Sequence, residues 1–166
     1  MYLKQVNKML IDFADVIDGD SVEAVCTLSR AVFLRESSDI NTADIYLRRL
    51  LQRFPDTKYA AYAEIELARI KVLAGMDKEA LEILTGFEDR WPPEETPGLD
   101  LVAVAAVNRG ALYYKFGNVR SALLDFKLSR NHATDEKIRK RAMLGLINIY
   151  RDGGYLNVAL KTLREY

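Results

Sequence analysis

The residue types that most often carry out chemistry are scarce in this chain. Its 166 residues include one histidine, His132, and one cysteine, Cys26. Close pairs of carboxylates include Glu64 with Glu66 and Glu94 with Glu95. Acid–base or nucleophilic catalysis needs several titratable groups that converge in one pocket, so an active site would have to draw on residues such as these.

Each of these residues has a simpler structural interpretation. Cys26 follows an apolar run with no histidine nearby in the sequence, so we expect a buried small apolar side chain and not a nucleophile. His132 stands at an expected helix end, where a cation or donor meets the last backbone carbonyls. The carboxylate pairs lie two residues apart, off a shared helix face, or fall in a loop, so solvation explains them.

Three further signatures of enzymes are missing from the sequence. It contains no glycine-rich phosphate loop, no histidine and cysteine cluster with metal-ligand spacing, and no serine elbow. We therefore predict no catalytic residue, no metal ligand and no cofactor. A role as an enzyme or enzyme domain is the least favoured of the functions considered below.

Charge and hydropathy argue against two other classes of function. The chain has 24 Lys and Arg against 24 Asp and Glu, so no long-range positive field collects nucleic acid. The one basic run, residues 137–141, follows two acidic residues and is interpreted as a solvated helix face. No apolar stretch approaches the roughly 20 residues that span a bilayer. We expect neither a nucleic-acid partner nor direct membrane insertion.

The start of the chain bears on its compartment. Its first residues do not form a signal peptide. We expect a cytoplasmic protein if these residues are the full length, and a periplasmic or envelope-associated protein if they are trimmed from a longer chain. A single cysteine is compatible with either compartment.

Apolar residues at three- and four-residue spacing predict helices along the whole chain. Residues 1–17 carry this pattern in Leu3, Val6, Met9, Leu10 and Phe13. The later helices are expected in pairs, at residues 21–36 with 41–54, 58–74 with 78–90, 99–116 with 119–130, and 135–151 with 156–166. Strict alternation of apolar and polar residues never lasts long enough to predict a strand. The predicted fold class is therefore all-α.

Glycine and proline mark the ends of these helices. Gly75, Gly117 and the pair Gly153 and Gly154 follow first helices, where a left-handed cap conformation is favourable only for glycine. Pro55 and Pro92 end second helices, because proline has no N–H donor and clashes with the preceding turn. Each helical pair is therefore bounded by its own turn residues.

A small residue recurs once in each helical pair. The alanines stand at intervals of 37, 42 and 37 residues, at Ala43, Ala80, Ala122 and Ala159. A repeat of this length indicates a stacked array of helical pairs. The longer middle interval comes from an inserted acidic, proline-rich loop at residues 93–98, which is either a partner contact or an inert spacer.

The third helical pair carries the fullest repeat motif, in which a small residue is followed by an aromatic, an alanine and a second aromatic: Gly110, Tyr113, Ala122 and Phe126. With these residues the chain resembles the tetratricopeptide repeat family. The other pairs match in part, at Ala31, Ala43, Leu47 and Pro55, at Ala68, Ala80, Leu84 and Pro92, and at Tyr150, Ala159 and Leu163. Leu34 and Lys71 stand where the family places a tyrosine. Residues 53–60 are similar to junctions in bacterial envelope members of the family.

The resemblance implies one helical-repeat domain over residues 1–166, built as a right-handed α-α superhelix, or solenoid. It would hold about four helical pairs after an N-terminal helix at residues 1–18, at residues 21–56, 57–92, 99–134 and 135–166. Alanine and glycine of the motif let helix axes approach closely, while Leu84, Phe126 and Leu163 fill the space between neighbouring pairs. We interpret these motif positions as structural.

In such an array the first helices line a concave groove. The family's groove-facing positions correspond to the candidate partner-binding residues Tyr62, Arg69, Val107, Asn108, Arg141, Leu144, Asn148 and Arg151. Other positions on this face are apolar or small, at Val25, Leu28, Val32, Ile65, Val104 and Ala111. The apolar positions would anchor a peptide, form the flank of the core, or lie under the helix of residues 1–17.

Three of these residues suggest a more specific contact. Arg69, Asn108 and Arg141 fall where co-chaperone members of the family hold the terminal carboxylate of a peptide. Ile65 and Gly145 stand where those members have a lysine and an arginine, so the carboxylate clamp is incomplete in this chain.

The resemblance implies a non-catalytic adaptor that binds a peptide or helical segment of another protein in its concave groove. The alternative is a self-assembling scaffold whose repeats pack end to end. That alternative rests on the apolar surface expected on the last helix, at Leu156, Val158, Leu160 and Leu163. We therefore expect a protein or peptide partner, with self-association as the second possibility.

Overall fold

The computed structural model describes residues 19–92 and 100–166, and all regular secondary structure in these residues is helical. This confirms the predicted all-α class. Contacts divide the chain into two compact units, residues 1–76 and 77–166, which we describe separately. The expected helix at residues 1–18 and the expected loop at 93–98 lie outside the described residues. The prediction of one domain over residues 1–166 stays a prediction.

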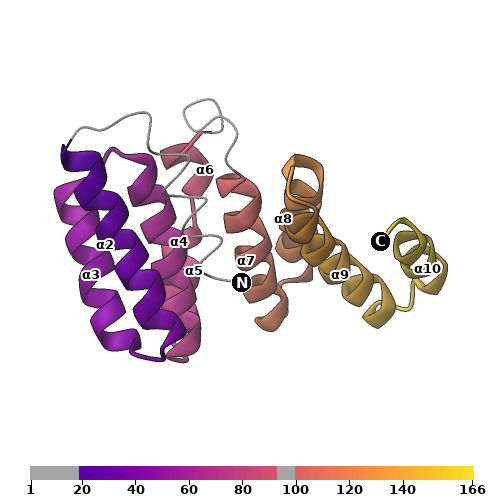
Figure 1. Ribbon diagram of the computed structural model, residues 1–166. Helices are drawn as coiled ribbons and strands as arrows, with labels where there is room; N and C mark the ends of the chain where they lie inside the picture. The colour runs from indigo at the N-terminus through magenta and orange to yellow at the C-terminus, as the bar shows by residue number, and fades with distance from the viewer. Residues whose placement is uncertain (1–18, 93–99) are drawn as a thin grey trace. The chain divides into compact units, whose positions relative to one another are not determined.

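The first unit is built from helices α2 (Gly19–Glu36), α3 (Ile40–Arg53) and α4 (Lys58–Leu73). Each of these helices packs against the other two, and Figure 1 shows them lying side by side. Leucines fill the space between them, with Leu28, Leu47 and Leu50 almost fully buried. The repeat alanine Ala43 is buried too, as the close approach of two helices requires.

The second unit contains α5 (Asp77–Leu84), α6 (Phe87–Arg90), α7 (Leu101–Lys115), α8 (Val119–His132), α9 (Glu136–Asp152) and α10 (Leu156–Glu165). Helices α7, α8, α9 and α10 pack in sequence, each against the next. Helices α7 and α9 also contact each other, which brings two of the expected first helices together.

The ring of Phe126 forms the central contact of the second unit. It packs with Val107, Ala142 and Leu146 in a buried cluster. A Cβ atom added to Gly145 of α9 would stand 2.5 Å from Phe126 Cζ, and one added to Gly110 of α7 would stand 3.2 Å from the same ring. The small residues therefore make room for this ring between two helices, in agreement with the structural interpretation of the motif.

The turn glycines behave as the sequence predicts at three positions. Gly75, Gly117 and Gly154 have φ angles between 75° and 78°, which only glycine adopts without strain. Gly153 differs, because it keeps a right-handed conformation and closes α9, so Gly154 alone makes the left-handed turn.

The expected helix at residues 78–90 is broken in the structure into α5 and α6. Gly86 adopts a left-handed conformation at the break, with φ of 66°. The Arg90 guanidinium donates hydrogen bonds to the Ile83 and Thr85 carbonyls, at 2.7 and 2.8 Å. These bonds satisfy carbonyls at the end of α5 that a continuous helix would have paired internally. The sequence interpretation missed this break, although Gly86 inside the predicted helix was a signal for it.

One carboxylate joins the starts of α7 and α9. Asp100 accepts hydrogen bonds from the Thr134 and Asp135 backbone N–H groups and from Thr134 Oγ1, at 2.5 to 3.0 Å. Burial acts to raise the Asp100 pKa, but these hydrogen bonds outweigh it and leave the pKa below its usual value. The contact fixes the turn before α9 against the turn before α7. The two helices that carry most of the candidate site are therefore anchored at one end.

No helix within the described ranges is both long and apolar enough to cross a bilayer.

Candidate partner-binding surface

Helix α9 presents a row of predicted partner-binding residues along one side. Arg141, Leu144, Asn148 and Arg151 follow one another at three- and four-residue spacing, which places them on one helix face. Arg141, Leu144 and Arg151 are exposed and Asn148 is half-buried. The structure therefore brings these four residues together on one surface.

Helix α7 extends this surface through a direct hydrogen bond. Arg141 Nη2 donates to Asn108 Oδ1 at 3.0 Å, joining the two helices. Asn108 Nδ2 is buried and has no hydrogen-bond partner in the described part of the chain. The bond holds the exposed guanidinium of Arg141 over the contact between α7 and α9. We call Asn108, Arg141, Leu144 and Asn148 the α7–α9 surface.

A second bridge joins the same helices near their C-terminal ends. Tyr114 Oη donates a hydrogen bond to the Asp152 carboxylate, and Arg151 pairs with that carboxylate at 2.8 Å. Hydrogen bonds from Arg151 and Tyr114 hold the pKa of Asp152 below its usual value. The same bond raises the pKa of Tyr114, because the phenol is stabilised in its protonated form. Two polar bridges thus join the exposed sides of α7 and α9.

Leu144 supplies an apolar contact point on this surface. Its side chain is 43% exposed, although it lies between the polar Arg141 and Asn148 along the helix. An exposed leucine beside an oriented arginine is a combination that suits a peptide with one apolar and one acidic side chain.

Val107 was predicted as a partner contact, and the structure corrects this. Its side chain is 2% exposed and belongs to the core cluster around Phe126. Val107 precedes Asn108 by one residue, so it points toward a different side of α7. It packs between helices and is unavailable to a partner.

The apolar candidate positions in the first half of the chain belong to the core. Val25, Leu28 and Ile65 are buried among the described helices of the first unit. They form the flank of the core, which was one of the alternatives that the sequence left open. Tyr62 is half-buried and remains a candidate.

Arg69 takes part in an ion-pair cluster of the first unit. Glu66 pairs with Arg69 one helical turn away and with Arg35 of α2 at 2.7 Å. Arg69 belongs to residues 1–76, whereas Asn108 and Arg141 belong to residues 77–166. A carboxylate clamp built from all three residues stays a prediction.

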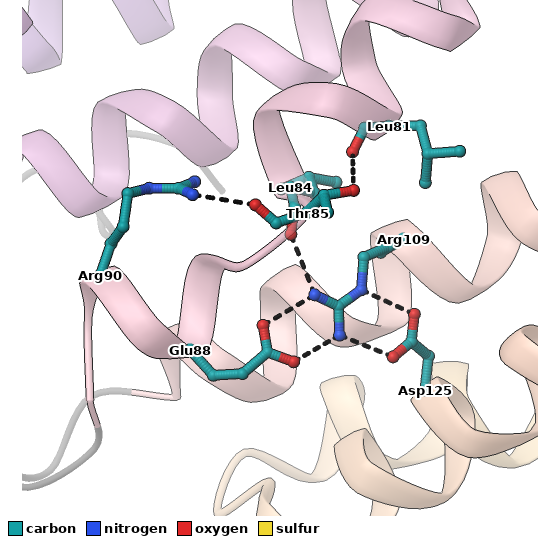
Figure 2. A network of polar contacts seen from close by, with 7 residues as sticks. All are labelled: Leu81, Leu84, Thr85, Glu88, Arg90, Arg109 and Asp125. Carbon is teal, nitrogen blue, oxygen red and sulfur yellow. Dashed lines mark hydrogen bonds and ion pairs between the residues drawn. The ribbon is translucent and has the colours of Figure 1, made fainter.

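The second unit contains a polar network that the sequence interpretation missed. Arg109 of α7 forms paired hydrogen bonds with Asp125 of α8, at 2.7 and 2.8 Å, and with Glu88 of α6, at 2.5 and 2.7 Å. It also donates to the Leu84 carbonyl at the end of α5, at 3.0 Å. Figure 2 shows the guanidinium between the two carboxylates. Its role is to tie four helical segments together.

The electrostatics of this network are set by burial and pairing. Burial raises the Asp125 pKa above its usual value, although Arg109 opposes the shift. Hydrogen bonds from Arg109 hold the Glu88 pKa below its usual value. Both carboxylates keep Arg109 protonated, with its pKa raised. The sequence signal for the network was a charged residue within the apolar run of residues 101–112, but its two partners lie 16 and 21 residues away.

The two residues singled out for chemistry are both on the surface. Cys26 is exposed, which contradicts the expected burial. His132 is exposed and is the last residue of α8. Within the described ranges, no group of three or more His, Cys, Asp or Glu side chains is placed to hold a metal ion.

A scan against protein-family models gives no match for this chain, and a search of curated proteins gives none either.

Proposed function

We propose that this chain is a tetratricopeptide-like helical solenoid that acts as a protein-binding adaptor through the α7–α9 surface. The observation that carries the proposal is the bond between Asn108 and Arg141, which holds an exposed guanidinium beside the exposed side chain of Leu144. Side chains from two helices of the array would then contact one bound segment together.

The charge of α9 indicates the chemistry of the partner. The helix carries two acidic residues, Glu136 and Asp152, against the basic residues Lys137, Arg139, Lys140, Arg141 and Arg151. The five basic residues outnumber the two acidic ones, so the net charge of the helix is positive. The proposed ligand is an acidic peptide segment with an apolar side chain, because it complements both the guanidinium and Leu144.

Peptide-display selection on the whole protein tests this proposal. The enriched peptides should combine Asp or Glu with a large apolar residue. Their binding should be lost in the double variant Arg141→Glu, Asn108→Ala and should weaken at high salt, since exposed charges are screened. Lys127→Glu, at an exposed position of α8, is the matched charge reversal and should keep full binding.

If the double variant binds the selected peptides as the wild type does, and Lys127→Glu loses them, the partner surface lies on α8. Circular dichroism of both variants checks that helicity is unchanged.

A second candidate function is self-assembly through α10. The leucines Leu156, Leu160 and Leu163 lie at four- and three-residue spacing on one side of this helix, and each is more than half exposed. Val158 is exposed as well. An apolar stripe of this kind favours a further helix as its partner. Sedimentation velocity tests this: the wild type should associate as concentration rises, and Leu160→Glu with Leu163→Glu should remain a monomer.

A further inference from the structure

Helix α10 leaves open a face that the other second helices keep buried. In α3, α5 and α8 this face carries an alanine and, four residues later, a larger apolar residue. All six side chains are at most 4% exposed: Ala43 and Leu47, Ala80 and Leu84, and Ala122 and Phe126. Helix α10 repeats the pattern with Ala159 and Leu163, but Leu163 is 51% exposed.

The next first helix covers this face in each of the other cases. Helix α3 packs against α4, α5 against α7, and α8 against α9. The contact of Phe126 with Gly145 is the closest of its kind, because a Cβ atom added to the glycine would stand 2.5 Å from Phe126 Cζ. No described helix follows α10. Leu163 therefore lacks the cover that a first helix gives to its counterparts.

Helix α2 carries the matching face of a first helix, and it too is open. Cys26, Ser29 and Phe33 lie at three- and four-residue spacing on one side, which we call the outer stripe of α2. Phe33 is 66% exposed and Cys26 is exposed. The repeat intervals of 37, 42 and 37 residues carry the stripe to positions that are buried or half-buried: Ala63, Glu66 and Ile70 in α4, Ala105, Asn108 and Leu112 in α7, and Ala142, Gly145 and Ile149 in α9.

We propose that α10 of one copy docks on the outer stripe of α2 of a second copy, in the packing that α8 and α9 make within one chain. The inference rests on the self-assembly proposed above for α10 and names the surface that α10 binds. The repeat intervals carry the contact of Phe126 with Gly145 onto Leu163 and Ser29. Helices joined by a short turn run antiparallel, as α8 and α9 do. The same arrangement places Ala159 near Phe33 and Tyr166 near Cys26.

The side chains of the stripe favour α2 as the acceptor. Cys26 stands where the other first helices have a buried alanine, and Phe33 stands where they have isoleucine or leucine. A small residue and a large apolar residue in this order receive a second helix at each of the other contacts. Among the described first helices, only α2 has this face exposed.

The proposed interface is heterologous, since its two sides are different surfaces of the same chain. Each copy can therefore bind one neighbour through α10 and another through α2. A variant that has lost either surface cannot bind its own kind, but it can still bind a variant that has lost the other.

Mixing two such variants tests the proposal. Leu160→Glu with Leu163→Glu blocks α10, and Phe33→Asp blocks α2. In sedimentation velocity the wild type should form larger species as concentration rises, and each variant alone should associate at least about tenfold more weakly. An equimolar mixture of the two should form a dimer and nothing larger. Ile45→Asp is the matched control, because Ile45 is an apolar residue of α3 with 65% exposure, and it should associate as the wild type does.

The outcomes separate the two levels of the proposal. A wild type that stays monomeric at all concentrations overturns self-assembly and this inference together. If Phe33→Asp associates as the wild type does while the α10 variant stays monomeric, self-assembly through α10 stands and docking on α2 is overturned. A mixture of the blocked variants that remains monomeric also overturns docking on α2, provided that circular dichroism shows unchanged helicity in both.

Disulfide trapping keeps the test valid if Phe33→Asp disturbs folding. Cys26 is the only cysteine in the chain, so Tyr166→Cys combined with Cys26→Ser places the sole thiol at the end of α10. Mild oxidation of this variant with a size-tagged wild type should give a mixed disulfide dimer on a non-reducing gel. Lys161→Cys with Cys26→Ser, on another side of α10, should give at least about tenfold less. Dimers formed only between copies of the Tyr166→Cys variant would show that α10 pairs with α10 and would overturn the proposal.

Discussion

In the second unit one arginine, Arg109, pairs with two carboxylates, Glu88 and Asp125. In the first unit one carboxylate, Glu66, pairs with two arginines, Arg35 and Arg69. In the second unit the side chains of Arg109 and Asp125 are only 10% and 8% exposed. In the first unit Glu66 is 10% exposed, and its partners Arg35 and Arg69 are 14% and 34% exposed. Each cluster has one partner that is about one-third exposed, Glu88 or Arg69. The clusters differ in the inner pair, because Asp125 is bound by paired hydrogen bonds from Arg109, whereas Arg35 divides its contacts between Glu66 and Glu36.

The comparison shows where an ion pair matters for stability. A charge left unpaired in a dry interior loses its hydration and gains nothing in return, whereas a charge near the surface regains water when its partner is removed. The Arg109 network should therefore be essential to the fold of the second unit. The Glu66 cluster should contribute less, because Arg35 keeps Glu36 as a partner when Glu66 is neutralised and Arg69 is one-third exposed.

The largest expected effect comes from removing Arg109. Arg109→Met keeps much of the side-chain volume but leaves Asp125 buried without its partner, so we expect a loss of about 3–5 kcal/mol in the free energy of unfolding. Urea unfolding followed by circular dichroism measures the loss. Hydrogen exchange should locate it in residues 77–166.

A second variant separates pairing from packing. Adding Asp125→Leu to Arg109→Met removes the stranded carboxylate, so the double variant should be more stable than the single one. If Arg109→Met alone cost less than about 1 kcal/mol, the network would resemble an ordinary surface ion pair and the contrast between the two units would fail.

A smaller effect is expected in the first unit. Glu66→Gln keeps the shape of the side chain and removes its charge, and we expect a loss of about 1–2 kcal/mol, as for hydrogen bonds to charged groups. The same urea titration measures it. If Glu66→Gln lowered the free energy of unfolding as much as Arg109→Met does, the contrast would fail. Arg35 would then need the Glu66 carboxylate as much as Asp125 needs the Arg109 guanidinium.

Acid should weaken the second unit through Glu88. Its pKa is lowered in the folded protein, so its contribution is present above the unfolded pKa near 4.5 and is lost as pH falls through the folded value. Asp125 acts in the opposite direction, because its pKa is raised. Unfolding midpoints at pH 6 and pH 3 should therefore differ less in Glu88→Gln than in the wild type. An equal or larger difference in the variant would contradict the assignment.

The smallest effect on stability is expected on the α7–α9 surface. Arg141 is exposed, so Arg141→Glu should change the free energy of unfolding by no more than about 0.5 kcal/mol. Thermal unfolding measures this. A larger loss would indicate that the bond to Asn108 serves the fold, and would remove the main support for a binding role.

Much of the fold follows from local patterns. The three- and four-residue spacing of apolar side chains predicted helices close to α2, α3, α4, α7, α8, α9 and α10. The turn glycines Gly75, Gly117 and Gly154 and the small residue Gly110 beside Phe126 were identified because their role depends on their own size, whereas the packing role of Gly145 was missed. On the candidate surface, Arg141 and Asn108 were both predicted from the sequence as partner-binding residues, and the structure joins them by a hydrogen bond.

The tertiary structure decided which side of each helix is core and which charges meet. Val107 and Leu144 have the same character in the sequence, but neighbouring helices bury the first and leave the second exposed. Arg109 acquires its role only from carboxylates on two other helices. Periodicity is a property of one helix, whereas burial and pairing depend on residues far away in the chain, so the sequence by itself determined the helices and their spacing and only packing determined their contacts.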